Sequence, residues 1–418
     1  MTVSNDIRLP GDRSVAVIGG GPAGLMAAEL LARAGAKVTV YDRMASLGRK
    51  FLMAGRGGLN LTHSEPLAAF LARYGDGDPS LRQAIEAFPP AALRAWADSL
   101  GEPTFIGSSG RVFPKSMKTS PLLRTWILRL NNLGVTFKLR HRWDGWDDDG
   151  RLRFVTSREE VLAEPDATVL ALGGASWPKL GADARWAETL RAQDIAVTPL
   201  RPANCGFTAA WTDVFRGFEG QPLKGIAADI AGRRVRGEAM ITREGIEGGA
   251  VYALSSPIRE AIERGGSAVV AIDLMPDVGA AKLTERLSAP RGKQSLSNFL
   301  RKATHLSAAA LALVREAALV KGVPLATLKP DALAALIKAA PVKLTGVQPI
   351  ATAISTAGGV SFSELDEGFM LKRYPGIFVA GEMLDWDAPT GGYLLQASFA
   401  TGVAAAHGAI RWLSINKG

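Results

Sequence analysis

Hydrophobic residues near the start of the chain follow the pattern of a strand, a helix and a second strand. Val15–Ile18 is an apolar, β-branched run that ends at three successive glycines. Pro22 then opens a run of small and apolar residues that stops at Gly35, as a helix would. Lys37–Tyr41 is a second β-branched run, closed by Asp42. This order predicts the first strands of a parallel α/β sheet.

Further elements follow from the same periodicity. Helices are expected over Leu67–Tyr74, Leu81–Phe88, Ala91–Leu100, Ser120–Leu133 and Gly391–Leu413. Strands are expected at Val135–Leu139, Ala167–Leu172 and Gly376–Ala380, with a hairpin turning at Asp147–Gly150 between Arg142–Trp146 and Leu152–Thr156. Short β segments are also expected after about Pro199, at Ile226–Ile230, Arg233–Val235, Ala239–Ile241 and Ala268–Ile272.

The changes of pattern along the chain predict three domains. Residues 1–198 and 352–418 form an α/β domain that is built from both ends of the chain. A β-rich domain, residues 199–276 and 341–351, interrupts it. That domain in turn carries a small basic helical domain, residues 277–340, which is rich in Ala and Leu.

Composition excludes several classes of protein. The 418 residues are 47% hydrophobic and 21% charged, too apolar for a disordered chain. The single cysteine, Cys205, excludes a disulfide scaffold and a dithiol redox enzyme, and we expect it to be a small buried residue. No apolar signal segment begins the sequence, and the uncharged stretch Ser14–Ala28 is too short to span a bilayer. We therefore expect a cytoplasmic protein without membrane insertion.

Positive charge is concentrated in two places. The net charge is +9, and Pro103–Trp143 holds eight Lys or Arg residues and no acid. Residues 277–340 hold ten Lys or Arg residues against four acids. Such patches suit the phosphates of a cofactor, a nucleotide or a nucleic acid, but a solvated basic face fits the same pattern.

The glycine run after the first strand is a G-x-G-x-x-G motif. Gly19 permits the tight turn, Gly21 lets the backbone approach a pyrophosphate, and Gly24 allows close packing of helix on strand. Pro22 and Ala23 open the helix, whose N-terminal N–H groups face the phosphates. Asp42 ends the second strand and is expected to hold the ribose hydroxyls. The motif therefore predicts dinucleotide binding.

Later glycine turns favour FAD over NAD as the resident dinucleotide. A strand ends at Gly173–Gly174, another at Gly381–Glu382, and Thr390–Tyr393 places Gly391 and Gly392 at the start of a helix. Such a turn can direct N–H groups at an electron-rich ring. FAD requires long contacts from several segments of this kind.

Together these motifs resemble the BaiN/RdsA family of FAD-dependent oxidoreductases. The resemblance runs over nearly the whole chain, through Gly19–Gly24, Gly48–Lys50, Gly110–Pro114, Thr356–Val360 and Gly381–Tyr393. It implies a Rossmann-like FAD domain interrupted by a β-barrel-like domain that carries a small helical domain. It also implies cofactor contacts from Asp42, Arg43, Arg49, Lys50, Gly57, Asn60, the backbone near Trp143, Gly381, Glu382, Gly392 and Tyr393, besides the first glycine turn.

One segment departs from the family pattern. The family commonly has Gly-Gly-Gly-Arg-Cys-Asn, whereas this chain has Gly58 and Leu59 at the Arg and Cys positions, with an Arg at Arg56. The departure indicates a divergent branch that has no thiol at this point.

Family activities reduce C=C bonds beside a carbonyl, in bile-acid enones and in a uracil of ribosomal RNA. The resemblance thus implies an NADH- or NADPH-driven reductase that delivers hydride from flavin N5 to an activated C=C bond. An RNA-modifying flavoenzyme that uses the basic helical insert, a non-catalytic flavin redox sensor and a flavin monooxygenase remain alternatives. The sequence leaves the substrate undecided between a small molecule and RNA.

Few residues qualify for the acid or oxyanion-stabilising roles. Arg111, Lys115 and Ser116, expected in a loop, are candidates, but phosphate contact or plain surface charge fits them as well. Tyr393 is a candidate proton donor, but the sequence favours a flavin-stacking or packing residue. No second G-x-G-x-x-G follows residue 24, so a nicotinamide dinucleotide must bind transiently, with its phosphates near Arg111.

The remaining candidates have ordinary explanations. His63 suits a surface or hydrogen-bonded structural position, and His141, His305 and His407 lack metal-ligand spacing, so no metal is expected. Trp177 and Pro178 are expected either to line a pocket or to pack in the core.

Overall fold

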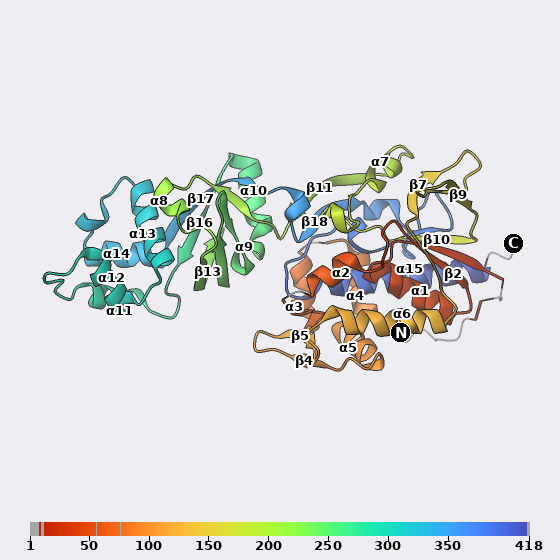
Figure 1. Ribbon diagram of the computed structural model, residues 1–418, viewed down its shortest axis with the longest axis horizontal. Coiled ribbons are helices and arrows are strands. Elements are labelled where there is room, and N and C mark those ends of the chain that lie inside the picture. The colour runs from red at the N-terminus through yellow and green to blue at the C-terminus, as the bar shows by residue number, and fades with distance from the viewer. Residues whose placement is uncertain (1–7, 10–11, 56, 76, 416–418) are drawn as a thin grey trace. The chain divides into compact units, whose positions relative to one another are not determined.

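The chain forms two compact units. The computed structural model describes residues 8–9, 12–55, 57–75 and 77–415 (Figure 1). Unit 1 comprises residues 1–201 and 355–418, and unit 2 comprises residues 202–354. Arg56, part of the segment that departs from the family pattern, lies outside the described residues.

Unit 1 is built on a five-stranded parallel sheet in the order β19–β10–β1–β2–β6. Its strands are β1 (Ser14–Ile18), β2 (Lys37–Asp42), β6 (Thr136–Leu139), β10 (Ala167–Leu170) and β19 (Ile377–Val379). The inner strands β1 and β10 are apolar on both faces, as a covered parallel sheet requires. The last strand comes from the far end of the chain, and this confirms the predicted Rossmann-like fold.

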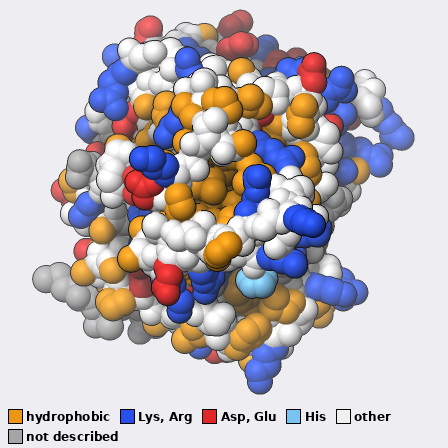
Figure 2. Space-filling view, turned by 90° about the vertical axis from the view of Figure 1, so that its left-hand side faces the viewer, with side chains coloured by type: hydrophobic (Ala, Val, Ile, Leu, Met, Phe, Trp, Pro, Cys, Tyr) orange, Lys and Arg blue, Asp and Glu red, His pale blue; other side chains and the backbone are white. Residues whose placement is uncertain are grey.

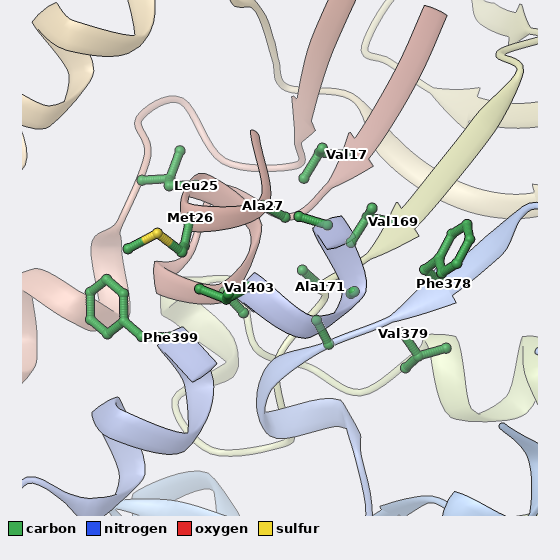
Figure 3. Packing of buried hydrophobic residues seen from close by; sticks show 14 of the residues in the cluster. Val17, Leu25, Met26, Ala27, Val169, Ala171, Phe378, Val379, Phe399 and Val403 are labelled. Atoms are coloured by element: carbon green, nitrogen blue, oxygen red, sulfur yellow. The ribbon is translucent and has the colours of Figure 1, made fainter. Parts of the chain in front are cut away.

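Two helices from opposite ends of the chain pack closely together. They are α1 (Pro22–Arg33) and α15 (Tyr393–Ile415). A Cβ at Gly402 would lie 2.4 Å from the backbone oxygen of Ala23, so only glycine permits this approach. Figure 3 shows Val403 of α15 and Ala27 of α1 near Val169 of β10 in the core.

Smaller elements surround this sheet. The helices are α2 (Arg49–Ala54), α3 (Leu67–Leu71), α4 (Pro79–Ala87), α5 (Pro90–Ser99), α6 (Thr119–Asn132) and α7 (Trp186–Arg191). Short sheets are formed by β3 (Thr62–His63), β4 (Thr104–Ile106) and β5 (Arg111–Pro114), by β7 (Arg142–Trp146), β8 (Leu152–Val155) and β9 (Glu160–Ala163), and by β11 (Val197–Ala203) with β18 (Ser355–Val360). The predicted hairpin at Asp147–Gly150 is confirmed.

The β3–β5–β4 sheet corrects one expectation. Arg111 was expected in a loop, but it begins β5 and lies opposite His63 of β3. Because β3 and β4 are only two and three residues long, they carry too little periodicity to be recognised in sequence.

Unit 2 contains a closed barrel in the order β12–β15–β14–β13–β16–β17. The strands are β12 (Phe207–Ala209), β13 (Pro222–Ile230), β14 (Arg233–Ile241), β15 (Gly245–Glu247), β16 (Ala268–Asp273) and β17 (Ala340–Val347). Two predicted short segments prove to be one strand, the nine-residue β14. Its exposed Arg and Glu side chains interrupt the apolar alternation from which the segments were predicted.

Helices complete unit 2. They are α8 (Asp213–Arg216), α9 (Gly249–Tyr252), α10 (Ser255–Gly265), α11 (Ala280–Leu287), α12 (Leu296–Thr304), α13 (Ala308–Val320) and α14 (Pro330–Lys338). The last four lie between β16 and β17, within the predicted helical segment, whose separation as a third domain stays a prediction. Within the described residues no single helix has the length and apolarity to cross a membrane, and only α12 and α13 together, bent by 119°, pass that criterion.

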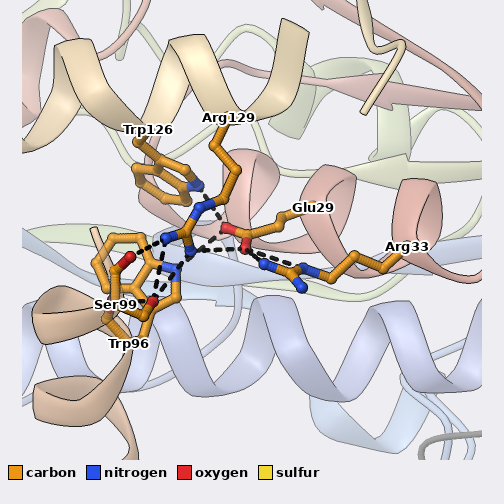
Figure 4. Close-up of polar contacts among 6 residues, drawn as sticks. All are labelled: Glu29, Arg33, Trp96, Ser99, Trp126 and Arg129. Atoms are coloured by element: carbon orange, nitrogen blue, oxygen red, sulfur yellow. Dashed lines mark hydrogen bonds and ion pairs between the residues drawn. The ribbon is translucent and has the colours of Figure 1, made fainter. Parts of the chain in front are cut away.

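A buried carboxylate ties α1 to two further helices (Figure 4). Glu29 accepts hydrogen bonds from the indole nitrogens of Trp96 on α5 and Trp126 on α6, at 3.1 and 2.8 Å. Arg33 and Arg129 pair with the same carboxylate at 2.7 and 3.2 Å. Burial acts to raise the pKa of Glu29, but the hydrogen bonds from Trp96, Arg33 and Arg129 outweigh it and lower this pKa.

Candidate functional site

The first glycine turn joins the end of β1 to the start of α1. A Cβ at Gly19 would lie 2.1 Å from the Ala171 oxygen, and one at Gly24 would lie 1.9 Å from the Gly19 oxygen. Gly21 borders open space instead, and as the N-cap of α1 it supplies no capping side chain. The helix therefore presents its first N–H groups to whatever occupies that space.

Asp42 lies beside this turn at the end of β2. Its Oδ2 accepts a hydrogen bond from the Gly20 N–H at 2.9 Å, and its Oδ1 accepts one from the Met44 N–H at 2.7 Å. Burial raises the pKa of Asp42, against the effect of these bonds and of the charges of Arg43 and Arg49. Each carboxylate oxygen keeps a further lone pair for a ribose hydroxyl.

The neighbours of Asp42 include two other predicted cofactor contacts. The His141 N–H donates to the Asp42 backbone oxygen at 2.9 Å, and this brings the start of β7, with Trp143, to the same edge. The indole Nε1 of Trp143 is buried without a hydrogen-bond partner among the described residues. The Arg43 guanidinium pairs with Asp183, so its charge is already engaged within the chain.

A second cluster gathers four distant segments around Glu382. Its Oε2 accepts from Lys50 Nζ at 2.6 Å and from the Gly174 N–H at 3.3 Å, and its Oε1 accepts from the Thr356 N–H at 3.0 Å. Lys50 Nζ also bonds Ser176 Oγ at 2.6 Å. The structure thus brings the predicted residues Lys50, Gly174 and Glu382 together. Sequence reasoning did not assign Thr356 and Ser176 to this cluster.

Glycines allow these segments to converge. A Cβ at Gly174 would lie 2.4 Å from the Thr356 hydroxyl oxygen, and one at Gly381 would lie 2.8 Å from the Cβ of Ala23. Both Gly173 and Gly381 have positive φ, at +74° and +82°. The Gly381 turn therefore lies against the start of α1, beside the first glycine turn.

The second glycine turn precedes α15. Gly391 and Gly392 have φ of +128° and +100°, and a Cβ at Gly392 would lie 2.5 Å from the Thr62 backbone. The Thr62 side chain is fully buried, and its hydroxyl has no hydrogen-bond partner in the described part of the chain.

Tyr393, the first residue of α15, has its hydroxyl committed within the protein. It donates to Glu65 Oε1 at 2.5 Å, and Arg73 pairs with the same carboxylate at 2.7 Å. Burial raises the pKa of Tyr393, and the hydrogen bond to Glu65 raises it further. Because the proton is directed at Glu65, a role as proton donor to a substrate requires this bond to break. Glu65 and Arg73 were missed, because nothing local in the sequence links them to Tyr393.

The segment that departs from the family pattern is structural in part. Leu59 is fully buried, so a core position is filled where relatives place a cysteine. Gly58 has a φ of +113°, and a Cβ there would lie 2.8 Å from the Met117 side chain. Asn60 donates its amide to the backbone oxygens of Thr62 and Val112, and Gly57 borders open space.

The remaining candidates lie in ordinary environments. His63 bonds the Ser109 oxygen and the Glu65 N–H, and this fits the structural explanation. Cys205 is buried in unit 2, as expected. Trp177 is partly buried with a φ of +61°. Lys115 is exposed, and Ser116 donates to Glu102.

His141 and His407 are partly buried and His305 is exposed. Burial lowers the pKa of His407, and the charge of Arg411 adds to this effect. Across the described ranges, His, Cys, Asp and Glu form no group of three or more suited to a metal. The expectation of no metal stays a prediction.

A cavity of about 540 Å³ lies within unit 2. It lies between the start of β13, the segment that leads into α11, and the junction of α12 with α13. Its described lining includes Lys224, Asp277 and His305 but no predicted cofactor contact.

The residues of unit 1 fit FAD. The open space at Gly21 and the uncapped start of α1 suit a pyrophosphate, and Asp42 suits a ribose. The buried, unpartnered Trp143 Nε1 lies in a strand that begins beside Asp42. The Gly381 turn and the Glu382 cluster bring the C-terminal segment to the same edge of the sheet.

Known proteins are similar to this chain. A 3-dehydro-bile acid delta(4,6)-reductase from Clostridium scindens is 26% identical over 94% of this chain and 98% of its own length. A ribosomal RNA dihydrouridine synthase from Escherichia coli is 26% identical over 93% of this chain and 96% of its own. A solved 3-ketosteroid delta1-dehydrogenase from Sterolibacterium denitrificans superposes with a TM-score of 0.50 at 12% identity, covering 97% of this chain and all of that one. That last likeness shows the fold alone.

The fold and the site define the class of FAD-dependent oxidoreductases, and this chain is an enzyme of that class. Within it, residues 13–408 match the model of the HI0933-like protein Rossmann domain, and the chain belongs to that family. This is the BaiN/RdsA family that the motifs resemble, so the predicted family, the FAD cofactor and the enzymatic class are confirmed.

Proposed function

We propose that the protein is an NADH- or NADPH-dependent reductase of a C=C bond activated by a neighbouring carbonyl. The observation that carries this proposal is the meeting of the Gly174 and Gly381 turns through Glu382, beside the first glycine turn. This arrangement suits a cofactor that runs from the start of α1 to the start of α15. The reductase named among the relatives supports the reaction type.

The proposed cofactor contacts divide along the molecule. Gly19, Gly21, Pro22, Ala23 and Gly24 would hold the pyrophosphate, and Asp42, with Arg43 and the backbone at Trp143, would hold the adenosine end. Arg49, Lys50, Gly57, Asn60, Gly173 and Gly174 would line the middle, Gly381 and Glu382 the ribityl chain, and Gly391, Gly392 and Tyr393 the isoalloxazine.

When bound, FAD supplies a flavin that accepts a hydride from the nicotinamide and delivers it from N5 to the β-carbon of the alkene. A proton must then reach the α-carbon, and the carbonyl oxygen needs hydrogen-bond donors as negative charge develops on it. Lys50 holds a positive charge beside Glu382 and Ser176, in a partly buried position. That charge makes Lys50 suited to orient an electron-rich group at this point of the site.

An anaerobic titration tests the proposal. The purified, FAD-loaded protein is mixed with NADH or NADPH, and the visible flavin spectrum is followed. Rapid bleaching by one of the two, followed by recovery of the spectrum on adding an enone, supports the reductase. A flavin that dithionite reduces but neither nucleotide reduces contradicts the proposed reductant.

A second candidate function has its own observation. Unit 2 carries exposed cations on and between α11 and α12: Lys282, Arg291, Lys293, Arg301 and Lys302 are exposed, and Arg286 is partly buried. Figure 2 shows Lys and Arg side chains interspersed with hydrophobic and uncharged ones on one face of the molecule. The cations on and between α11 and α12 would suit the phosphates of an RNA substrate. Steep weakening of RNA binding with added salt, together with uracil reduction, would favour this reading. An absence of binding at low salt would remove it. The enzymatic class argues against the non-catalytic flavin redox sensor, while a flavin monooxygenase and a cytoplasmic location stay predictions.

A further inference from the structure

The β4–β5 hairpin has one face that combines aromatic rings with cations. Alternate residues of a strand point to the same face, so Arg111 and Phe113 of β5 share one face. Lys115 continues the alternation, and its N–H donates to the Pro103 oxygen at 2.8 Å, which extends the pairing of the strands. Phe105 of β4 lies directly opposite Phe113, with ring centroids 5.9 Å apart.

This face is open to solvent, whereas the opposite face is buried at Val112 and Pro114 of β5 and exposed at Ile106 of β4. Phe105 is 38% exposed, and Arg111 and Lys115 are exposed, whereas Val112 on the other face is fully buried. Glu102 is the acid nearest in sequence, and it accepts a hydrogen bond from Ser116 Oγ at 2.8 Å. The cations Arg111 and Lys115 therefore flank an aromatic pair that is exposed at Phe105, partly buried at Phe113, and part of neither hydrophobic core.

Gly58 lies at the edge of this face, beside Met117 and Phe113. A Cβ at Gly58 would lie 3.7 Å from the Phe113 ring and 2.8 Å from the end of Met117. With glycine there, no side chain at position 58 covers the Phe113 ring. Met117 itself is 38% exposed beside it.

The hairpin is linked to the second glycine turn through strand β3. Its strand β5 pairs with β3, where Arg111 lies opposite His63. The His63 ring stacks on Tyr393 at 5.6 Å, and the Gly392 backbone approaches Thr62 closely. A ligand on the aromatic face thus lies on the same small sheet that borders the proposed isoalloxazine contacts.

We propose that this face binds the adenosine diphosphate end of the nicotinamide dinucleotide, with adenine on Phe105 and Phe113 and the phosphates on Arg111 and Lys115. Aromatic faces stack on bases, and Arg and Lys bind phosphate oxygens. One aromatic pair and two cations match a single dinucleotide, whereas an RNA surface neutralises several phosphates. This inference rests on the proposed function, because it supplies a place for that function's reductant.

The test separates binding from hydride transfer. ADP is titrated into the FAD-loaded protein by calorimetry, since ADP carries the adenine and phosphates but no nicotinamide. Phe105→Ala is expected to weaken ADP binding about 5- to 30-fold, the effect of losing one stacked base. Phe105→Tyr keeps the ring and is expected to bind like wild type, and Arg111→Ala is expected to weaken binding most at low salt. Arg158→Ala, an exposed arginine of the β8–β9 turn, is the matched control.

The same variants are then followed by anaerobic stopped-flow with NADH and NADPH. The proposal expects Phe105→Ala to raise the nucleotide concentration for half-maximal flavin reduction by the same factor, with an unchanged limiting rate. It is overturned if wild type does not bind millimolar ADP, or if ADP binding is equal in wild type and both hairpin variants. It is also overturned if the hairpin variants weaken the binding of a fluorescent single-stranded RNA but not the binding of ADP. ADP binding through the hairpin without flavin reduction by either nucleotide would contradict the proposed function and leave the hairpin as an adenine-nucleotide site.

Discussion

Glu29 is a buried carboxylate of unit 1 and Glu382 a partly buried one, and they are held by different kinds of donor. Glu29 is surrounded by side chains, namely two indoles and two guanidinium groups from three helices. Glu382 takes one ammonium group and the backbone N–H groups of Gly174 and Thr356. Side-chain donors join helices, whereas backbone donors fix the path of the turns themselves.

The two carboxylates therefore have different roles: one stabilises the fold, and the other aligns the turns of the candidate site. The α1–α5–α6 junction around Glu29 lies on helices and contains none of the predicted cofactor contacts. The Glu382 junction contains three of them, at Lys50, Gly174 and Glu382. Loss of the first carboxylate should therefore weaken the fold, and loss of the second should loosen the site.

The largest effect is expected for Glu29→Gln. The substitution leaves Arg33, Arg129 and two indole N–H groups without their anionic acceptor, in a site where Glu29 is only 3% exposed. We expect the free energy of unfolding to fall by about 2–4 kcal/mol. Urea unfolding followed by fluorescence measures it, with the exposed Glu159→Gln as control. If Glu29→Gln is as stable as Glu159→Gln, the structural role of Glu29 is contradicted. At low temperature, where Glu29→Gln stays folded, its flavin content should equal that of wild type.

Glu382→Gln is expected to lower stability less than Glu29→Gln does, and to weaken FAD binding more. The neutral amide loses the ionic attraction to Lys50. Because only its oxygen accepts hydrogen bonds, either the Thr356 N–H or the Gly174 N–H together with Lys50 loses its acceptor. We expect a loss of about 1 kcal/mol in stability and FAD binding that is roughly tenfold weaker. Equilibrium dialysis of FAD measures the second quantity.

A double-mutant cycle with Lys50→Met sharpens this prediction. The two residues interact directly, so the effects of the single substitutions on FAD affinity should not add. Additive effects would show that Lys50 and Glu382 act separately, and unchanged FAD affinity in Glu382→Gln would remove the alignment role.

The same contrast explains what the sequence could predict. The first glycine turn was recognised because Gly19, Gly21, Gly24 and Asp42 lie within one strand–helix–strand unit, where local spacing determines the geometry. The Rossmann-like sheet followed from the same local patterns, including the return of the chain end as β19.

The contacts between distant segments were not predictable in this way. Lys50 and Glu382 are 332 residues apart, and each looked like a cofactor contact rather than a partner of the other. Glu29 lies in an ordinary apolar helix, where the (i, i+4) spacing to Arg33 was the one available signal and Trp96 and Trp126 gave none. Likewise, the aromatic face of β5 became visible only when pairing placed Phe105 opposite Phe113.

The smallest expected effect is the acid dependence that Glu29 contributes. Its pKa is lowered by folding, so its stabilisation is complete above its ordinary value of 4.5 and is lost as the pH falls through the lower, folded pKa. One such group changes stability by at most about 1.4 kcal/mol per pH unit. Asp42 acts in the opposite direction, because burial raises its pKa, so wild type alone does not isolate Glu29. The contribution of Glu29 is isolated by comparing the urea unfolding of wild type and Glu29→Gln at a series of pH values below 5, because Asp42 is common to both proteins. The stability difference should narrow as the pH falls, and a constant difference would mean that Glu29 stays ionised or contributes through packing rather than charge.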